Sequence, residues 1–184
     1  MSRKDIPNLI SILRIILIIP FAWSLKIGDY FQALTIFVIA GVSDALDGFL
    51  AKHFHWQSRL GSILDPIADK LLLVVSFATL AMLGLLPMWL LWLVLARDLV
   101  IVIGALCYHY IVGRFELTPL WSSKINTALQ IMLILLVIIK EYWFPQLEKV
   151  VTIGIWLVVA SIINSGSEYI LVWGLKAWRQ IKKQ

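Results

Sequence analysis

Residues 31–50 read FQALTIFVIAGVSDALDGFL, an apolar run that is long enough to cross a bilayer as a helix, for which about 20 residues suffice. Two carboxylates, Asp44 and Asp47, lie near its end. The next apolar run, residues 63–85, begins with two more, Asp65 and Asp69. Carboxylates are among the most costly side chains to place in a membrane span. This stretch therefore indicates a fold of membrane-spanning helices, and its carboxylates are the first candidates for functional residues.

The whole chain has the composition of a polytopic membrane protein. Of its 184 residues, 61% are hydrophobic and 15% are charged, whereas soluble domains have about 45–50% apolar and about 25% charged residues. A soluble domain and a disordered chain are therefore excluded, and the single cysteine, Cys107, excludes a disulfide scaffold. The net charge of +5 does not indicate a nucleic-acid partner, because no basic run is interleaved with stacking aromatic residues.

Six apolar stretches predict an all-α bundle of six transmembrane helices in a single domain, residues 1–184. Their approximate bounds are 9–25, 31–50, 63–85, 88–112, 125–139 and 150–175. With the N-terminus inside, ten Lys and Arg residues flank the spans on the cytoplasmic side and three on the other. Because cytoplasmic loops are enriched in basic residues, we expect both termini in the cytoplasm.

The four aspartates form two pairs that can converge. At 100° per residue, Asp44 and Asp47 lie about 60° apart on one helix, and Asp65 and Asp69 about 40° apart on the next. Both pairs flank the same cytoplasmic loop. Four like charges need either bound protons or divalent cations. Oxygen-only ligands favour Mg²⁺ or Mn²⁺ over Ca²⁺, and the lack of nearby cysteine argues against zinc.

Small residues beside the acids leave room for a ligand at the backbone. Gly48 and Ala51 follow Asp47, and Gly61 lies one turn before Asp65. With the nearby cation of Lys52, these features indicate a pocket for a pyrophosphate, because divalent ions commonly bridge phosphate oxygens.

The stretch Asp44-Ala-Leu-Asp47-Gly48-Phe-Leu-Ala51-Lys52, eight further residues, and Gly61-Ser-Ile-Leu-Asp65-Pro-Ile-Ala-Asp69 resembles the signature of the CDP-alcohol phosphatidyltransferase family. That signature is D-x2-D-G-x2-A-R-x8-G-x3-D-x3-D. Every fixed position and gap agrees except Lys52, where the family has arginine; lysine keeps the charge but lacks the two-pronged donor. The opening PNLISILR, residues 7–14, is similar to the family's first span, and the six-span layout is the family's.

The resemblance implies the roles of the aspartates and of the small residues. Asp44, Asp47 and Asp65 would hold two divalent cations, Mg²⁺ or Mn²⁺, with help from Asp69, and Asp69 would deprotonate the acceptor hydroxyl. The cytidine site would be lined by Gly48, Ala51 and Gly61, with Lys52 near the diphosphate. The alcohol would attack the β-phosphorus of CDP-diacylglycerol and release CMP. The resemblance also implies a homodimer, and we expect a bacterial inner membrane protein with a cytoplasmic active site.

The acceptor is a glycerol-based alcohol by the same resemblance. Arg97, Lys124 and Asn126 resemble family positions around the acceptor pocket. The S-K-x-N-T form of residues 123–127 is more like the CMP-forming cardiolipin synthases, whereas phosphatidylglycerophosphate synthases often carry G-K-x-K-T. The form found here has one lysine fewer than G-K-x-K-T, which favours phosphatidylglycerol over an acceptor with a free phosphate. Glycerol 3-phosphate is the alternative acceptor.

Arg97 has a neighbouring acid but is not expected to pair with it. Asp98 follows it directly, and adjacent helical residues point about 100° apart. Because buried charges in spans usually pair, Glu168 or Asn164 is the expected partner if Arg97 stabilises the bundle instead of binding the acceptor.

A cation or proton carrier is the alternative from another functional class, because intramembrane carboxylates also mark ion pathways. A carrier does not require the glycine and alanine spacing seen here. A purely structural scaffold is hard to reconcile with six acids in or beside apolar stretches, since each costs about 2.5–3.5 kcal/mol at the bilayer centre.

Overall fold

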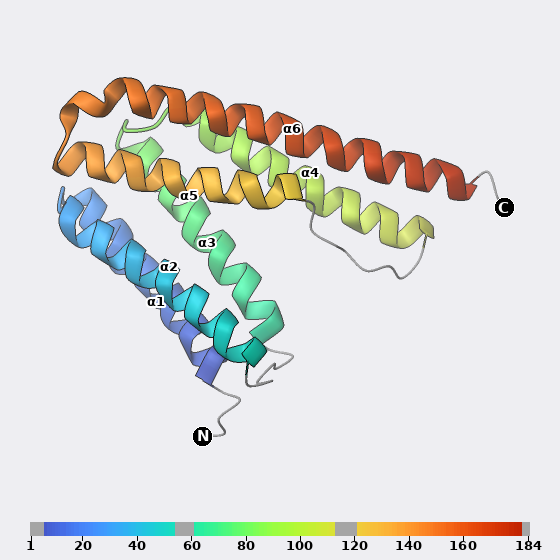
Figure 1. The fold of residues 1–184 in the computed structure, drawn as a ribbon, viewed down its shortest axis with the longest axis horizontal. Helices are drawn as coiled ribbons and strands as arrows, with labels where there is room; N and C mark the ends of the chain where they lie inside the picture. Colours follow the sequence, from blue (N-terminus) through green and yellow to red (C-terminus); the bar gives the residue numbers. More distant parts are fainter. Residues whose placement is uncertain (1–5, 54–60, 113–120, 182–184) are drawn as a thin grey trace. The chain divides into compact units, whose positions relative to one another are not determined.

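The structure, a computed structural model, describes the backbone of residues 6–53, 61–112 and 121–181 and the side chains of residues 9–44, 46, 61, 64–104 and 121–169. This part of the chain is all-α, as predicted. Figure 1 shows its helices: α1 (Ile6–Lys26), α2 (Tyr30–His53), α3 (Gly61–Met82), α4 (Met88–Val112), α5 (Trp121–Tyr142) and α6 (Glu148–Ile181), with a short 3-10 turn η2 (Pro145–Leu147).

The helix α6 extends beyond the predicted apolar stretch at its C-terminal end. The prediction ended near residue 175, whereas the helix continues to Ile181. Hydropathy locates the part of a helix that suits the membrane core. Lysine, arginine and glutamine are good helix formers, so the helix continues through the polar residues that follow.

Apolar length makes the chain compatible with a membrane protein. Within the described residues, three segments are long and apolar enough to cross a bilayer: Leu9–Lys26, Trp121–Tyr142 and Pro145–Tyr169. Large apolar side chains such as Ile19, Trp23 and Trp156 are exposed on these helices. Such surfaces suit a hydrocarbon solvent. Six crossings and cytoplasmic termini stay predictions.

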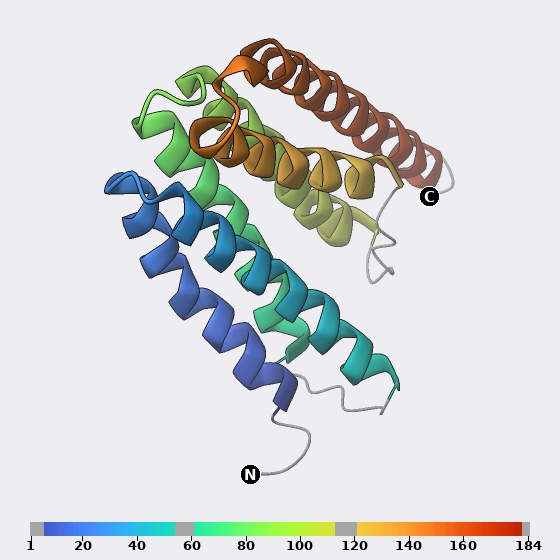
Figure 2. The same ribbon diagram turned by 60° about the vertical axis from the view of Figure 1, so that its left-hand side comes forward.

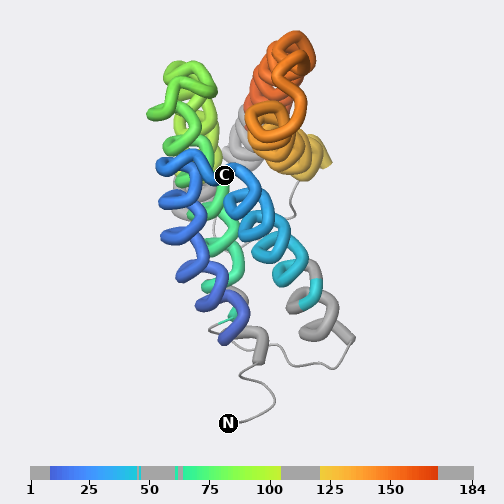
Figure 3. Tube along the Cα trace, turned by 90° about the vertical axis from the view of Figure 1, so that its left-hand side faces the viewer, coloured from blue at the N-terminus to red at the C-terminus, as the bar shows by residue number. Residues whose placement is uncertain are grey.

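The helices pack as two compact units. The first comprises Met1–Leu86 and Ile134–Gln146, and the second comprises Pro87–Leu133 and Leu147–Gln184, so α5 contributes to both. In the first unit α1 packs against α2 and against α3, and Figures 2 and 3 show α1 and α2 side by side. In the second unit α4 packs against α6.

The core of the first unit surrounds α1. Phe21 of α1 is fully buried and meets Phe37 of α2, with ring centroids 5.5 Å apart. Ala33 and Ala40 of α2 and Ala68 of α3 are also fully buried. Small residues at these positions let helix backbones approach closely. The helix α1 is thereby held between two neighbours, and its polar residues can reach both.

Two glycines end helices in the left-handed conformation. At the end of α1, Gly28 has φ +78°, its N–H donates to the carbonyl of Leu25, and the N–H of Asp29 donates to the carbonyl of Ser24. Gly84 closes α3 in the same way, with φ +74°. These pairs of bonds are the Schellman motif. Asp29 then caps α2, because its Oδ1 accepts from the N–H of Gln32 at 2.9 Å.

We expect Gly28→Ala to destabilise the first unit by about 1–2 kcal/mol, because an L side chain is strained at positive φ. Gly41→Ala is the matched control: Gly41 lies inside α2, and a Cβ there would have no atom within 4 Å. That substitution should raise stability by up to about 1 kcal/mol. Thermal unfolding in detergent measures both, and equal effects would contradict the conformational assignment.

Candidate active site

Arg14 of α1 brings together carboxylates from two other helices. Its Nη2 lies 2.7 Å from Oδ1 of Asp44 on α2, and its Nη1 donates to Oδ1 of Asp69 on α3. The side chain of Arg14 is 1% exposed, whereas those of Asp44 and Asp69 are 43% and 47% exposed. One buried cation therefore contacts two carboxylates that the rest of the described protein leaves partly exposed. The predicted convergence of α2 and α3 aspartates is confirmed for these two.

Asp65, the third predicted site aspartate whose side chain the structure describes, contacts the same face of α1. The hydroxyl of Ser11 donates to Oδ1 of Asp65. Ser11 and Arg14 are three residues apart and Asp65 and Asp69 four apart, so each pair shares one helix face. Their partners are separated by 54 and 55 residues along the chain. This nearly constant separation shows that α1 and α3 run parallel here.

Sequence reasoning gave no role to Ser11 or Arg14. Both were noted only as part of an opening similar to the family's first span. The usable signal was Arg14 itself, since an arginine inside an apolar run costs about as much as an aspartate and needs a partner. Its partners could not be named, because they lie on two other helices.

The structure describes only some of the other residues predicted to bind the metal ions or the CDP-lipid. Gly61 is buried at the start of α3, one turn before Asp65. The helix α2 includes Asp47, Gly48, Ala51 and Lys52, but their side chains lie outside the described residues. Among the side chains that the structure does describe, no three carboxylates surround a common point at metal-binding range. The donors are nevertheless oxygen-only, which is the chemistry that Mg²⁺ and Mn²⁺ select.

A second polar cluster lies in the second unit, centred on Arg97 of α4. Its Nη2 donates to the hydroxyls of Ser123 on α5 at 2.8 Å and Ser165 on α6 at 2.7 Å. Its Nη1 donates to Oδ1 of Asp98 at 2.9 Å. The expectation that Arg97 would not pair with Asp98 is therefore wrong. The flexible arginine side chain folds back to the adjacent carboxylate, so the angle between the two Cβ directions does not decide the contact.

The same cluster continues one turn toward the C-terminus on α5 and one turn toward the N-terminus on α6. The hydroxyl of Ser161 donates to Oδ1 of Asn126 at 2.7 Å. In the described part of the chain Arg97 contacts neither Glu168 nor Asn164, the partners expected for it in the bundle. Ser161 and Ser165 share a face of α6. We call the polar side chains of this cluster the α4–α6 polar seam; they are Arg97, Ser123, Asn126, Ser161 and Ser165.

Several buried polar atoms of the described side chains in this region have no hydrogen-bond partner. In the described part of the second unit, four buried side-chain atoms have no hydrogen-bond partner: Arg97 Nε, Ser122 Oγ, Asn126 Nδ2 and Gln130 Nε2. Buried polar atoms without partners are costly, and a bound molecule with oxygen atoms would satisfy them. Two of the three predicted acceptor residues, Arg97 and Asn126, belong to this seam, where Arg97 is bonded to Ser123 and Ser165 and Asn126 to Ser161. The third, Lys124, is exposed, with its Nζ 5.0 Å from the ring centre of Trp121.

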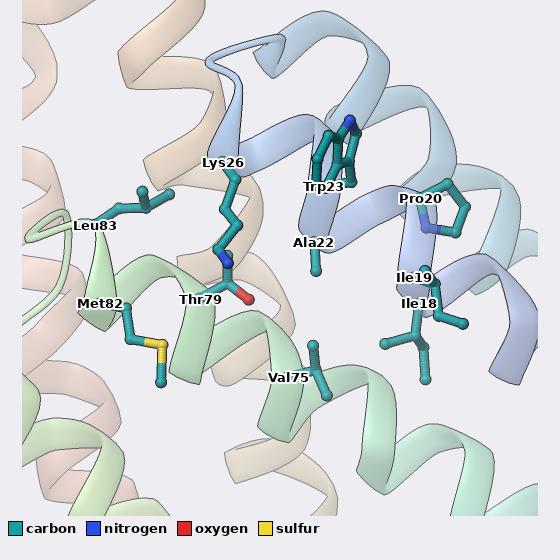
Figure 4. A pocket seen from close by; sticks show the side chains of 10 residues that line it. All are labelled: Ile18, Ile19, Pro20, Ala22, Trp23, Lys26, Val75, Thr79, Met82 and Leu83. Carbon is teal, nitrogen blue, oxygen red and sulfur yellow. The ribbon is translucent and has the colours of Figure 1, made fainter.

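An apolar groove of about 730 Å³ lies between the C-terminal halves of α1 and α3 (Figure 4). Its lining includes Ile18, Trp23 and Val75, with Lys26 and Thr79 as polar members. None of the predicted site residues lines it. Such a lining suits hydrocarbon and does not suit a nucleotide diphosphate.

The chain is similar to known phosphatidyltransferases over most of its length. The pattern that defines CDP-alcohol phosphatidyltransferases matches residues 4–164. A rat protein named cardiolipin synthase (CMP-forming) is 32% identical over 70% of this chain and 48% of its own length. A Bacillus subtilis protein named CDP-diacylglycerol--glycerol-3-phosphate 3-phosphatidyltransferase is 27% identical over 95% of this chain and 91% of its own length.

A rice protein named CDP-diacylglycerol--glycerol-3-phosphate 3-phosphatidyltransferase 1, chloroplastic, is 32% identical over 97% of this chain and 58% of its own length. The chain spans about half the length of the rat, human and rice relatives. The match of the family pattern covers far more than half of this chain. The chain belongs to the CDP-alcohol phosphatidyltransferase family.

Proposed function

We propose that this protein transfers the phosphatidyl group of CDP-diacylglycerol to a glycerol-based alcohol, releases CMP, and needs divalent cations to do so. The observation that carries the proposal is the gathering of Asp44, Asp65 and Asp69, three acids of the family signature, on one face of α1. Relatives named as cardiolipin synthase and as glycerol-3-phosphate phosphatidyltransferase support the reaction class.

In the proposed mechanism, Asp44, Asp47 and Asp65 would hold two Mg²⁺ or Mn²⁺ ions with help from Asp69. Such ions, when bound, neutralise charge on the diphosphate and on the leaving CMP. Asp69 takes the proton of the acceptor hydroxyl, and the hydroxyl oxygen bonds to the β-phosphorus. The bond from that phosphorus to the oxygen of CMP breaks, and CMP leaves with the electron pair. The exposure of Asp69 lets a hydroxyl approach it.

The donor lipid would bind beside these carboxylates. We assign Gly48, Ala51 and Gly61 to the cytidine site and Lys52 to the diphosphate. The buried position of Gly61 at the first residue of α3 supports this, because a glycine puts no side chain in the way of a ligand that approaches the backbone.

Phosphatidylglycerol is the favoured acceptor, bound by Arg97, Lys124 and Asn126. The charge of Arg97 is already balanced by Asp98 at 2.9 Å. A neutral pair suits hydroxyl and phosphodiester oxygens better than the dianionic phosphate of glycerol 3-phosphate. Glycerol 3-phosphate is the alternative acceptor, favoured by the name of the Bacillus subtilis relative.

We further propose six membrane crossings, cytoplasmic termini, a homodimer, and a bacterial inner membrane with the carboxylates facing the cytoplasm. The excess of basic residues at the cytoplasmic ends supports the topology. Exposed apolar side chains on α1 and α6 support burial in lipid.

We expect detergent-solubilised protein to release CMP from CDP-diacylglycerol only with Mg²⁺ or Mn²⁺, and EDTA to stop the release. Asp65→Asn and Asp69→Asn should each lower the rate at least about 100-fold, because a lost ligand or base is a loss of transition-state stabilisation. Asp29→Asn is the matched control: it is an exposed acid of the same unit, and asparagine also caps helices. Metal-independent release, or full activity of both site variants, would refute the proposal.

An acceptor competition tests the alcohol. With CDP-diacylglycerol, phosphatidylglycerol and glycerol 3-phosphate supplied together, mass spectrometry should find cardiolipin as the main product. Arg97→Gln should raise the KM for the acceptor about 10-fold or more and leave the KM for CDP-diacylglycerol unchanged, since it removes charge-assisted hydrogen bonds in the polar seam only. Phosphatidylglycerophosphate as the main product would establish the alternative acceptor.

The carrier alternative has a separate test. Liposomes that contain the protein and no CDP-lipid should show no protein-dependent uptake of protons or Mn²⁺. Uptake that Asp69→Asn abolishes would support a carrier.

A further inference from the structure

Arg14 is the buried charge to which the proposed mechanism gives no chemical role. It lies within the apolar helix α1 at 1% exposure and contacts carboxylates of both neighbouring helices. A single guanidinium that contacts both Asp44 and Asp69 resembles a bridging metal ion in position, since it joins two carboxylates, but its one positive charge compensates only one of them. The pairing also offsets the cost of placing each charge in a span.

We propose that Arg14 is an internal counter-ion that competes with the divalent cation for Asp44 and Asp69 and holds α1, α2 and α3 together whenever that cation leaves. Ser11, an uncharged residue, holds Asp65 in the same way, by donating a hydrogen bond to it. The inference rests on the proposed function, because it assigns to Asp44 and Asp69 a cation that they bind.

The competition follows from charge and geometry. The three described carboxylates carry three negative charges, and Arg14 compensates one of them. A guanidinium 2.7 Å from a ligand oxygen repels a divalent ion at that oxygen. The exposure of Asp44 and Asp69 leaves a path by which an ion can reach them from solvent. Arg14 should therefore lower metal affinity while it stabilises the protein without metal.

Charge and shape can be separated with two substitutions. Arg14→Gln removes the charge, and Arg14→Lys keeps the charge but cannot donate to two carboxylates from a planar fork. Arg97→Gln is the matched control, because Arg97 is also a buried arginine paired with an aspartate, in the second unit.

The experiment measures Mn²⁺ binding by electron paramagnetic resonance and the unfolding temperature with and without Mn²⁺, on purified protein in detergent. Compared with wild type, Arg14→Gln should bind Mn²⁺ about tenfold more tightly and, in EDTA, unfold at least about 5 °C lower. Saturating Mn²⁺ should restore most of that loss. Arg14→Lys should keep the wild-type affinity within about twofold and lose only part of the stability in EDTA. The control Arg97→Gln should leave Mn²⁺ affinity unchanged.

The outcomes distinguish this inference from the proposed function. Wild-type affinity or weaker Mn²⁺ binding in Arg14→Gln, with binding intact in wild type, would overturn the competition and leave the metal-dependent function standing. Absence of Mn²⁺ binding in all variants would refute the metal-dependent function and the inference together. If Arg14→Gln does not fold in EDTA, the Mn²⁺ affinity of Arg14→Lys tests the inference instead. If Arg14→Lys changed the Mn²⁺ affinity as much as Arg14→Gln does in its folded, Mn²⁺-loaded form, the charge of Arg14 would have no role.

Discussion

Opposite charges inside apolar helices must bind one another, and the contact of Arg14 with Asp44 and Asp69 is the interaction on which the first unit depends. An uncompensated charge in a membrane span costs several kcal/mol, so neither the arginine nor the aspartates fit alone. The need for this pairing explains why α1 lies between α2 and α3 and why α1 and α3 run parallel. Packing of Phe21 on Phe37 and the small buried alanines then let the three helices approach closely enough.

The polar clusters of the two units differ in their chemistry. Carboxylates dominate in the first unit, and Asp44 and Asp69 are close to half exposed, as groups that meet ions and substrate would be. Hydrogen-bond donors dominate in the second unit, where Arg97 and Asn126 are buried and retain atoms without partners. The balanced pair of Arg97 and Asp98 makes the second cluster less suited to a free phosphate.

Apolar periodicity and length predicted the helices well, because each is a long run that no turn interrupts. The convergence of Asp44 with Asp69 was also predictable, since only a few residues of sequence separate their helices. Ser11 and Arg14 had no predicted role because their partners lie 54 and 55 residues away, and a pairing across parallel helices leaves no local pattern. Arg97 with Asp98 was predicted wrongly, because helical geometry fixes Cβ directions and not the reach of a long side chain. The seam of Ser161 and Ser165 was missed although their four-residue spacing was visible.

Anomalous X-ray scattering from crystals of the Mn²⁺-loaded protein tests the central claim most directly. The account predicts manganese peaks bonded to carboxylate oxygens of Asp44, Asp47 and Asp65, with help from Asp69, at about 2.1–2.2 Å, a range typical of small hard cations with oxygen ligands, and it predicts that the guanidinium of Arg14 moves away from at least one of its two carboxylates. Manganese elsewhere in the protein, or no manganese while Arg14 still bridges Asp44 and Asp69, would contradict it.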